Sequence, residues 1–334
     1  MERKRSELYT ASKIVATFYV VVAHAAIMYT PQGFYTPARS SALMSMLSEF
    51  FYAFHMPLFF FLSGCVYGYC VESGKYQNIP AYIRTKAKRL LIPYFAVGCC
   101  YVAPATVLLG LTSDGYWNYL IPGILTSDHS RHLWYLMALF LIYILVIPLK
   151  WFPLNNAKRI CLAVFLGYLV KRDAWRLPAI FQIESAFLYV FYFFLGIAFH
   201  HYFEQLVCFL KKGYLGIGIA ALLFQLTMFL EGLPELPGVL YCVMGIVMTL
   251  ALVWGLLTHF PSIPSAGWYQ CSKRNAFAIY LFHPIIIYVF FHILCPYDIP
   301  PAVMVLSASI LSALLSIVLA NGIRKLHLQI LIGE

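Results

Sequence analysis

The sequence has few charged residues and no long polar stretch, and these two shortages exclude an ordinary soluble protein. Charged residues make up 11% of the 334 positions, hydrophobic residues make up 62%, and the mean hydropathy is +0.79. Such a composition is typical of a chain that lies in lipid. No low-complexity segment divides the chain, so we expect a single membrane domain over residues 1–334.

Metal-ligand motifs are also missing. The nine cysteines form no C-x-x-C pair and show no zinc-ligand spacing. We therefore expect no metal site and interpret the cysteines as small apolar residues within the spans.

Apolar runs close to twenty residues long predict an all-α polytopic bundle of about ten transmembrane helices. The run at 160–170 is short. The ten runs lie at approximately 11–30, 46–70, 90–112, 132–150, 160–170, 181–200, 214–231, 239–258, 275–296 and 303–322.

The loops between these runs carry positive charge unequally. If the loops alternate from a cytoplasmic N-terminus, eighteen of the 23 Lys and Arg residues fall inside, and only Arg39, Arg131, Lys171, Arg172 and Arg176 fall outside. This pattern predicts that both termini are cytoplasmic, and it supports the short run, whose omission would invert every later loop. Topology thus explains the net charge of +10 without a nucleic acid partner.

The N-terminus has a second interpretation. Arg3-Lys4-Arg5, an apolar run and Ala23-His24-Ala25 resemble the three regions of a cleavable signal peptide. We expect the segment to remain as the first span, because a multispan protein needs no cleaved signal.

The first run places a cation and an imidazole on one helical stripe. Lys13 and His24 are eleven residues apart, and eleven steps of about 100° return to within about 20° of the same face. At about 1.5 Å per residue they lie about 16 Å apart, so Lys13 can sit near the membrane surface while His24 lies deep in the bilayer. An imidazole there is costly unless it faces inward, which makes His24 a functional candidate.

Two further histidines stand beside prolines within apolar runs. His55-Met56-Pro57 and His283-Pro284 each place an imidazole where proline frees a main-chain carbonyl, that of Ala53 or Tyr280. A polar internal cavity and simple hydrogen bonding to these carbonyls are both open as explanations.

Basic residues gather at the predicted cytoplasmic side, and other polar residues stand near the ends of spans. The basic residues could simply anchor the topology or could bind a polyphosphate. The candidates are Lys13, Arg84, Lys86, Lys88, Arg89, Lys273 and Arg274, with Asn275 beside them. His132 and Trp134 begin an outer-side span, where an aromatic belt is the alternative interpretation. Glu49 and Glu184 could orient an imidazole or bind sugar hydroxyls, or could lie at the outer interface.

Taken in order, these motifs resemble the membrane-bound acyltransferase 3 family, and within it the branch of fucose 4-O-acetylase and other sugar O-acetyltransferases. Tyr9 departs from the pattern, since many relatives carry an acidic residue near this point. The resemblance rests on the Lys13-to-His24 spacing and on the segments His55–Gly64, Lys88–Tyr94, His132–Leu136 and Ile279–Pro284.

The resemblance implies transfer of an acyl group, typically acetyl from cytosolic acetyl-CoA, to a hydroxyl of a glycan or glycolipid at the membrane. Such a reaction needs a base, and an imidazole with a pKa near 6.5 suits that task, so His24 is the candidate base. The basic residues and Asn275 are then candidates for binding CoA, while His55, His132, Trp134, His283, Glu49 and Glu184 are candidates for supporting the site or the substrate. The arrangement suggests a bacterial inner membrane.

Several alternatives stay open at this point. Direct transfer is favoured over an acyl-histidine intermediate, because no cysteine or serine forms an evident nucleophile–base pair with His24. A glycan exporter or other secondary transporter would also use internal histidines and broken helices, although the sequence shows no internal repeat. A scaffold subunit would leave His24 without a role. The composition is compatible with a homo-oligomer, because apolar interfaces leave no trace in it.

Overall fold

The computed structural model describes residues 2–127, 130–150, 155–171, 180–231 and 236–334, and every regular element in these ranges is a helix. The prediction of an all-α polytopic membrane protein is confirmed. Arg172 and Arg176 of the predicted outer loop lie outside the described residues. The helices are α1 Glu2–Ala26, α2 Ala42–Glu72, α3 Ile79–Val97, α4 Ala103–Leu108, α5 Tyr116–Tyr119, α6 Trp134–Leu145, α7 Asn156–Lys171, α8 Ile183–His201, α9 Phe203–Glu231, α10 Leu236–His259, α11 Gly267–Leu294 and α12 Pro301–Lys325.

Eight helical stretches within the described residues are long and apolar enough to cross a membrane. They correspond to eight of the ten predicted runs. Of the other two, 132–150 is covered by a shorter apolar helix at Arg131–Leu145, and 160–170 lies in α7, which has 16 residues. The count of ten spans therefore stays a prediction. Val164, Phe165 and Tyr168 of α7 are exposed, which suits a helix in contact with lipid.

Local sequence signals set where these helices begin and bend. The side chains of Ser41 and Asn78 cap α2 and α3 by accepting hydrogen bonds from main-chain N–H groups in the first turn, at 3.3 Å and 3.0 Å. A π-helical turn at Gly98–Val102 joins α3 to α4, so that the apolar stretch runs from Ile79 to Leu108. Gly213 has non-helical dihedral angles and bends α9.

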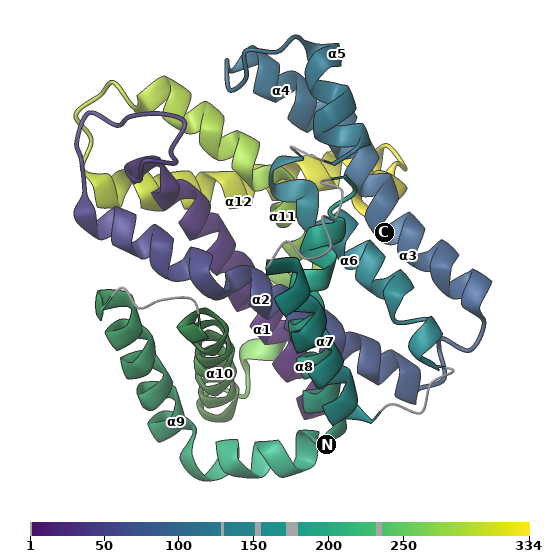
Figure 1. Ribbon diagram of the computed structural model, residues 1–334. Helices are drawn as coiled ribbons and strands as arrows, with labels where there is room; N and C mark the ends of the chain where they lie inside the picture. Colours follow the sequence, from purple (N-terminus) through teal and green to yellow (C-terminus); the bar gives the residue numbers. More distant parts are fainter. Residues whose placement is uncertain (1, 128–129, 151–154, 172–179, 232–235) are drawn as a thin grey trace.

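Helix α2 forms the centre of the bundle and packs against α1, α8 and α10. Figure 1 shows α9 beside α10 at one edge, while α4 and α5 project from another. Helix α1 also packs against α11 and α12. The central position of α1 and α2 buries the face of α1 that carries His24 and surrounds it with side chains of α2 and α11.

Contacts between loops and helix ends show that α1 and α11 run in the same direction. Near their starts, the Tyr269 hydroxyl donates to the Glu7 carboxylate at 2.8 Å. Beyond their ends, Arg39 and Asp298 form an ion pair, with Nη2 of Arg39 2.7 Å from Oδ2 of Asp298. Lys13 therefore lies toward the first end of the bundle, where α11 also begins.

Candidate active site

Four histidines from distant parts of the chain meet inside the bundle. His24 comes from α1, His55 from α2, His132 from the turn before α6 and His283 from α11. The ring centroids of His24 and His283 are 5.0 Å apart, those of His24 and His55 6.4 Å, and those of His132 and His283 6.0 Å. We call these four residues the histidine cluster. His283 and His55 are almost completely buried, whereas His24 is half-buried.

Three of these imidazoles bond to the preceding turn of their own helix. A carbonyl oxygen only accepts, so the Nδ1 atom facing it must carry the proton, and Nε2 of the neutral ring is left as an acceptor. The Nδ1 atoms of His24, His55 and His283 lie 2.9 Å, 2.7 Å and 2.8 Å from the carbonyl oxygens of Val20, Phe51 and Ile279.

His132 is held in the opposite way, by its Nε2 atom. This atom donates to the carbonyl oxygen of Leu281 at 3.0 Å, which leaves Nδ1 as the acceptor. The Tyr280 hydroxyl in turn donates to the main-chain carbonyl of His132. These two bonds tie the turn before α6 to α11 and place His132 against His283.

The two proline sites differ in how their freed carbonyls are satisfied. Pro284 leaves the carbonyl of Tyr280 without its helical partner, and Nδ1 of His283 lies 3.1 Å from that oxygen. The simple explanation by hydrogen bonding therefore holds for Nδ1 of His283. It does not account for Nε2 of His283, which is buried without a hydrogen-bond partner.

At Pro57 the histidine does not serve the freed carbonyl. The Sγ atom of Cys242 in α10 lies 3.1 Å from the carbonyl oxygen of Ala53 and donates to it. His55 instead bonds to Phe51, one turn earlier. The presence of an imidazole at position 55 is therefore not explained by the carbonyl that Pro57 frees.

Three of the predicted CoA-binding cations line one cavity of about 210 Å³, which we call the cation cavity. Lys13, Lys86 and Arg89 reach it from α1 and α3. Its described lining includes no Asp or Glu, so the positive charge there is not neutralised by a carboxylate of the wall. A cavity with this charge and no acidic wall residue suits an anionic ligand.

Lys86 is held in place by aromatic rings. Its Nζ atom lies 3.8 Å from the ring centroid of Tyr143 and donates to the Tyr76 hydroxyl at 2.9 Å. Cation–π contacts of this kind stabilise a partly desolvated ammonium group. Lys86 is 7% exposed, which distinguishes it from the exposed Arg89.

The cation cavity lies directly beside the histidine cluster. Phe59 lines the cavity one turn after His55 on α2, and Tyr280 lines it one turn before His283 on α11. The rings of Tyr280 and His132 are 5.8 Å apart. The described lining of the cation cavity includes none of the four histidines, so Phe59 and Tyr280 mark where its wall meets the helices that carry His55 and His283.

The structure places the remaining predicted basic residues elsewhere. Arg84, Lys88, Lys273 and Arg274 are exposed and do not line the cation cavity. Their positions suit the topological anchor that was the alternative interpretation.

The Asn275 side chain is hydrogen-bonded to the last turn of α12. Its Oδ1 atom accepts from Nη1 of Arg324 at 2.7 Å, and its Nδ2 donates to the carbonyl of Cys271. Arg324 also donates from Nε to Glu334 at 2.8 Å, and these bonds hold the pKa of the Glu334 carboxyl below its usual range. Asn275 joins α11 to the C-terminal segment and does not line the cation cavity.

The other predicted supporting residues lie outside the histidine cluster and do not line the cation cavity. Trp134 packs against Tyr189 and Phe60, with ring centroids 5.3 Å and 6.1 Å away. Glu49 and Glu184 are both exposed, as expected for residues near an interface.

Tyr52 also touches the histidine cluster, although it was not among the residues predicted from the sequence. Its ring centroid lies 5.5 Å from that of His24 and 4.9 Å from that of His55. Helical spacing could have found it, because Tyr52 precedes His55 by three residues and shares its face of α2.

A second feature that the sequence did not indicate is a chain of contacts that begins at Tyr9, on the wall of the cation cavity, and leads away from it. The Tyr9 hydroxyl donates to Nδ1 of His200 at 3.1 Å, and Nε2 of His200 donates to Glu72 at 2.7 Å. Arg5 lies 3.4 Å from the same carboxylate. This chain holds the Tyr9 side chain at the cavity, and no local pattern predicts it because Tyr9 and His200 are 191 residues apart.

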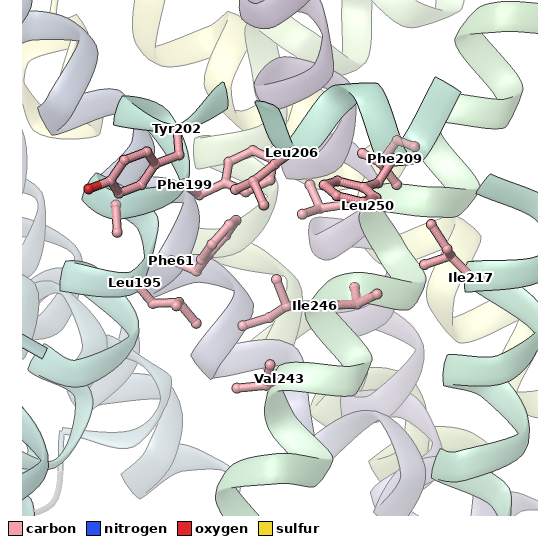
Figure 2. Close-up of a pocket in the computed structure, with 13 residues that line it drawn as sticks. Phe61, Leu195, Phe199, Tyr202, Leu206, Phe209, Ile217, Val243, Ile246 and Leu250 are labelled. Atoms are coloured by element: carbon pink, nitrogen blue, oxygen red, sulfur yellow. The ribbon is translucent and has the colours of Figure 1, made fainter. Parts of the chain in front are cut away.

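A larger cavity of about 350 Å³ lies between α2, α8, α9 and α10 and carries no such chemistry. Figure 2 shows its lining, which includes Phe61, Leu195, Phe199 and Ile246. The described lining contains no charged side chain and no imidazole. In the described part of the chain, no group of three or more His, Cys, Asp or Glu side chains is arranged to hold a metal ion.

Comparison with known proteins agrees with this geometry. A family model described as an acyltransferase domain matches residues 10–321, a range that contains all of the histidine cluster and the three cavity cations. No curated protein and no solved structure matches the chain. Because the match covers nearly the whole sequence, the chain belongs to the acyltransferase 3 family and is a membrane acyltransferase.

Proposed function

We propose that this protein transfers an acyl group, specifically acetyl from cytosolic acetyl-CoA, to a hydroxyl of a cell-surface glycan or glycolipid precursor, with His24 as the general base. The observation that carries the proposal is the state of the His24 imidazole. Its Nδ1 proton is engaged by the carbonyl of Val20, so Nε2 presents a lone pair to the interior.

The cation cavity supports CoA as the donor. CoA carries its negative charge on phosphates at one end and its thioester at the other, and the phosphates suit Lys13, Lys86 and Arg89. The distance along α1 from Lys13 to His24 is about 16 Å, comparable to an extended pantetheine arm. A donor bound by its phosphates in the cation cavity can therefore present its thioester to the histidine cluster.

The chemistry needs only a base and two positioned reactants, because a thioester is already activated. Nε2 of His24 takes the proton of the acceptor hydroxyl as its oxygen attacks the thioester carbonyl. The tetrahedral intermediate then collapses, the C–S bond breaks, and His24 returns the proton to the departing CoA thiolate. The new ester and CoA thiol balance the reaction, and no acyl-enzyme is required.

The family match favours this enzyme over the glycan exporter that the sequence alone left open. The position of the cations agrees, because Lys13, Lys86 and Arg89 gather in one cavity toward the start of α1. A transport path would need polar groups along both halves of the bundle.

The test is transfer of label from radiolabelled acetyl-CoA to an extract of free and lipid-linked glycans by the purified protein in nanodiscs. We expect the wild type to label a glycan and His24→Ala to lose about 10²-fold or more of that rate, since a general base contributes 10²–10⁴. His292→Ala is the matched control, because His292 is exposed on α11 and lies outside the histidine cluster.

The experiment also defines failure of the proposal. Affinity for CoA is measured separately by equilibrium binding to the same nanodiscs. A folded wild type that labels no glycan, releases no CoA and binds no CoA does not perform this reaction.

A further inference from the structure

The histidine cluster offers hydrogen-bond acceptors and lacks donors. Each of its four rings gives its single proton to a main-chain carbonyl, namely that of Val20, Phe51, Leu281 or Ile279. A neutral imidazole has only one N–H, so the second nitrogen of every ring in the cluster can only accept.

Two of these acceptors are buried without a partner. Nε2 of His283 and Nδ1 of His132 make no hydrogen bond to the described part of the chain, and the two side chains are 0% and 8% exposed. Buried polar atoms are almost always paired, so these two acceptors call for a partner that brings a donor, and a bound water or a hydroxyl of a ligand supplies one.

The carbonyl bonds also set the direction in which the unpaired atoms point. In an imidazole the two nitrogens lie on different sides of the ring. When Nδ1 of His24 and of His283 bonds back to its own helix, Nε2 of each ring is turned away from that helix. Their ring centroids are only 5.0 Å apart, so one small ligand can reach both rings.

The kind of ligand follows from the missing donors. A carboxylate or phosphate brings only acceptors and would be repelled by four lone pairs. In the described residues no group of three or more His, Cys, Asp or Glu side chains is arranged to hold a metal ion. A neutral molecule with several hydroxyls supplies the donors that the cluster lacks, without a charge to bury.

We propose that the cluster is the acceptor subsite and that it recognises a neutral polyhydroxy ring through two neighbouring hydroxyls. One hydroxyl gives its proton to Nε2 of His24 and is acylated, and the next donates a hydrogen bond to Nε2 of His283. His132 accepts from the same ligand through Nδ1. This assignment rests on the proposed acyl transfer and adds the role of His283 and the recognition of two neighbouring hydroxyls of one ring.

The test compares acceptors that differ in one hydroxyl. Methyl glycosides of neutral hexoses and 6-deoxyhexoses are offered with acetyl-CoA, followed by monodeoxy and mono-O-methyl derivatives of any that cause CoA release. An ether oxygen still accepts but cannot donate, so O-methylation beside the acylated position should lower kcat/KM of the wild type about tenfold or more, as deoxygenation does.

Variants of His283 then assign the effect to this ring. In His283→Leu, which keeps the volume but lacks the acceptor, the parent glycoside and its neighbouring deoxy derivative should react at nearly equal kcat/KM. In His283→Gln the amide oxygen replaces Nε2 as an acceptor, and the preference for the parent should return in part. If His283→Leu does not fold, the preference for the parent glycoside over its deoxy derivative is compared between His283→Gln and His132→Leu instead.

Each outcome is decisive. An equal deoxy penalty in the wild type and in the folded His283 variants overturns the assignment while leaving acyl transfer intact. Labelling of the glycan extract with no reaction of any methyl glycoside also overturns it, because recognition is assigned to two hydroxyls of a single ring. Absence of both transfer and CoA binding in the wild type overturns the proposed function itself.

Discussion

At the scale of single residues, two exposed neighbours in α3 differ in whether they reach the cation cavity. Arg89 lines it, whereas Lys88 does not. Both were equal candidates for binding CoA when only the sequence was considered. Their positions differ by about 100° around the helix axis, so the two side chains leave α3 in different directions and only that of Arg89 reaches the cavity.

This difference predicts that substitutions of Arg89 and Lys88 have different effects on KM for acetyl-CoA. Arg89→Ala should raise KM for acetyl-CoA about tenfold with little change in kcat, because it removes the proposed contact to a CoA phosphate, which is distant from the reacting atoms. Lys88→Ala, the matched control, should leave both constants near the wild-type values. Steady-state kinetics with acetyl-CoA measures both, and equal effects of the two changes would remove Arg89 from the donor site.

At the scale of helices, the bundle depends on a close crossing of α2 and α8. Gly64 lies against the main-chain carbonyl of Phe193, and Gly196 lies against that of Phe61. A Cβ atom at either position would overlap main-chain atoms of the facing helix. A flexible side chain could move out of the way, but the backbone of a packed helix cannot. Small residues at such crossings let membrane helices approach closely.

Gly64→Ala and Gly196→Ala should therefore lower the thermal unfolding temperature by several degrees or reduce the yield of folded protein. Gly216→Ala in α9 is the control, because a Cβ there meets nothing within 4 Å. Alanine should even stabilise that helix by up to about 1 kcal/mol. Unfolding of the three purified variants in one detergent measures this, and equal unfolding temperatures would contradict the close crossing.

At the scale of the whole molecule, α1 and α11 begin at the same end of the bundle. The contacts Tyr269–Glu7 and Arg39–Asp298 mark the two ends. Arg324 and Lys325 close α12 on the side where α11 begins, since Arg324 bonds to Asn275 near the start of the apolar part of α11. The excess of inside Lys and Arg predicts that this end faces the cytoplasm.

Reporter fusions test that orientation in a bacterial host. Green fluorescent protein fused after Glu334 should fluoresce, and alkaline phosphatase fused there should be inactive, because the first folds in the cytoplasm and the second outside it. Fusions to a chain truncated after Asp298, in the loop beyond α11, should give the opposite result. The reverse pattern at both sites would show that the bundle is inserted the other way.

Features that depend on short-range periodicity and composition could be predicted from the sequence. Apolar runs predicted the long apolar helices, and charge asymmetry predicts an orientation that the reporter fusions test. The eleven-residue spacing placed Lys13 and His24 on one stripe because both lie on one helix with a known turn. Tyr52 was within reach of the same argument through its spacing from His55.

Which distant residues meet depends on the folded chain. His132 and His283 are brought together by contacts between a turn and a distant helix, and no local period encodes such a contact. The choice of Lys86 and Arg89 over Lys88 depends on which face of α3 the bundle covers. The acceptor nitrogens of the histidine cluster likewise depend on main-chain carbonyls whose positions exist only in the folded chain.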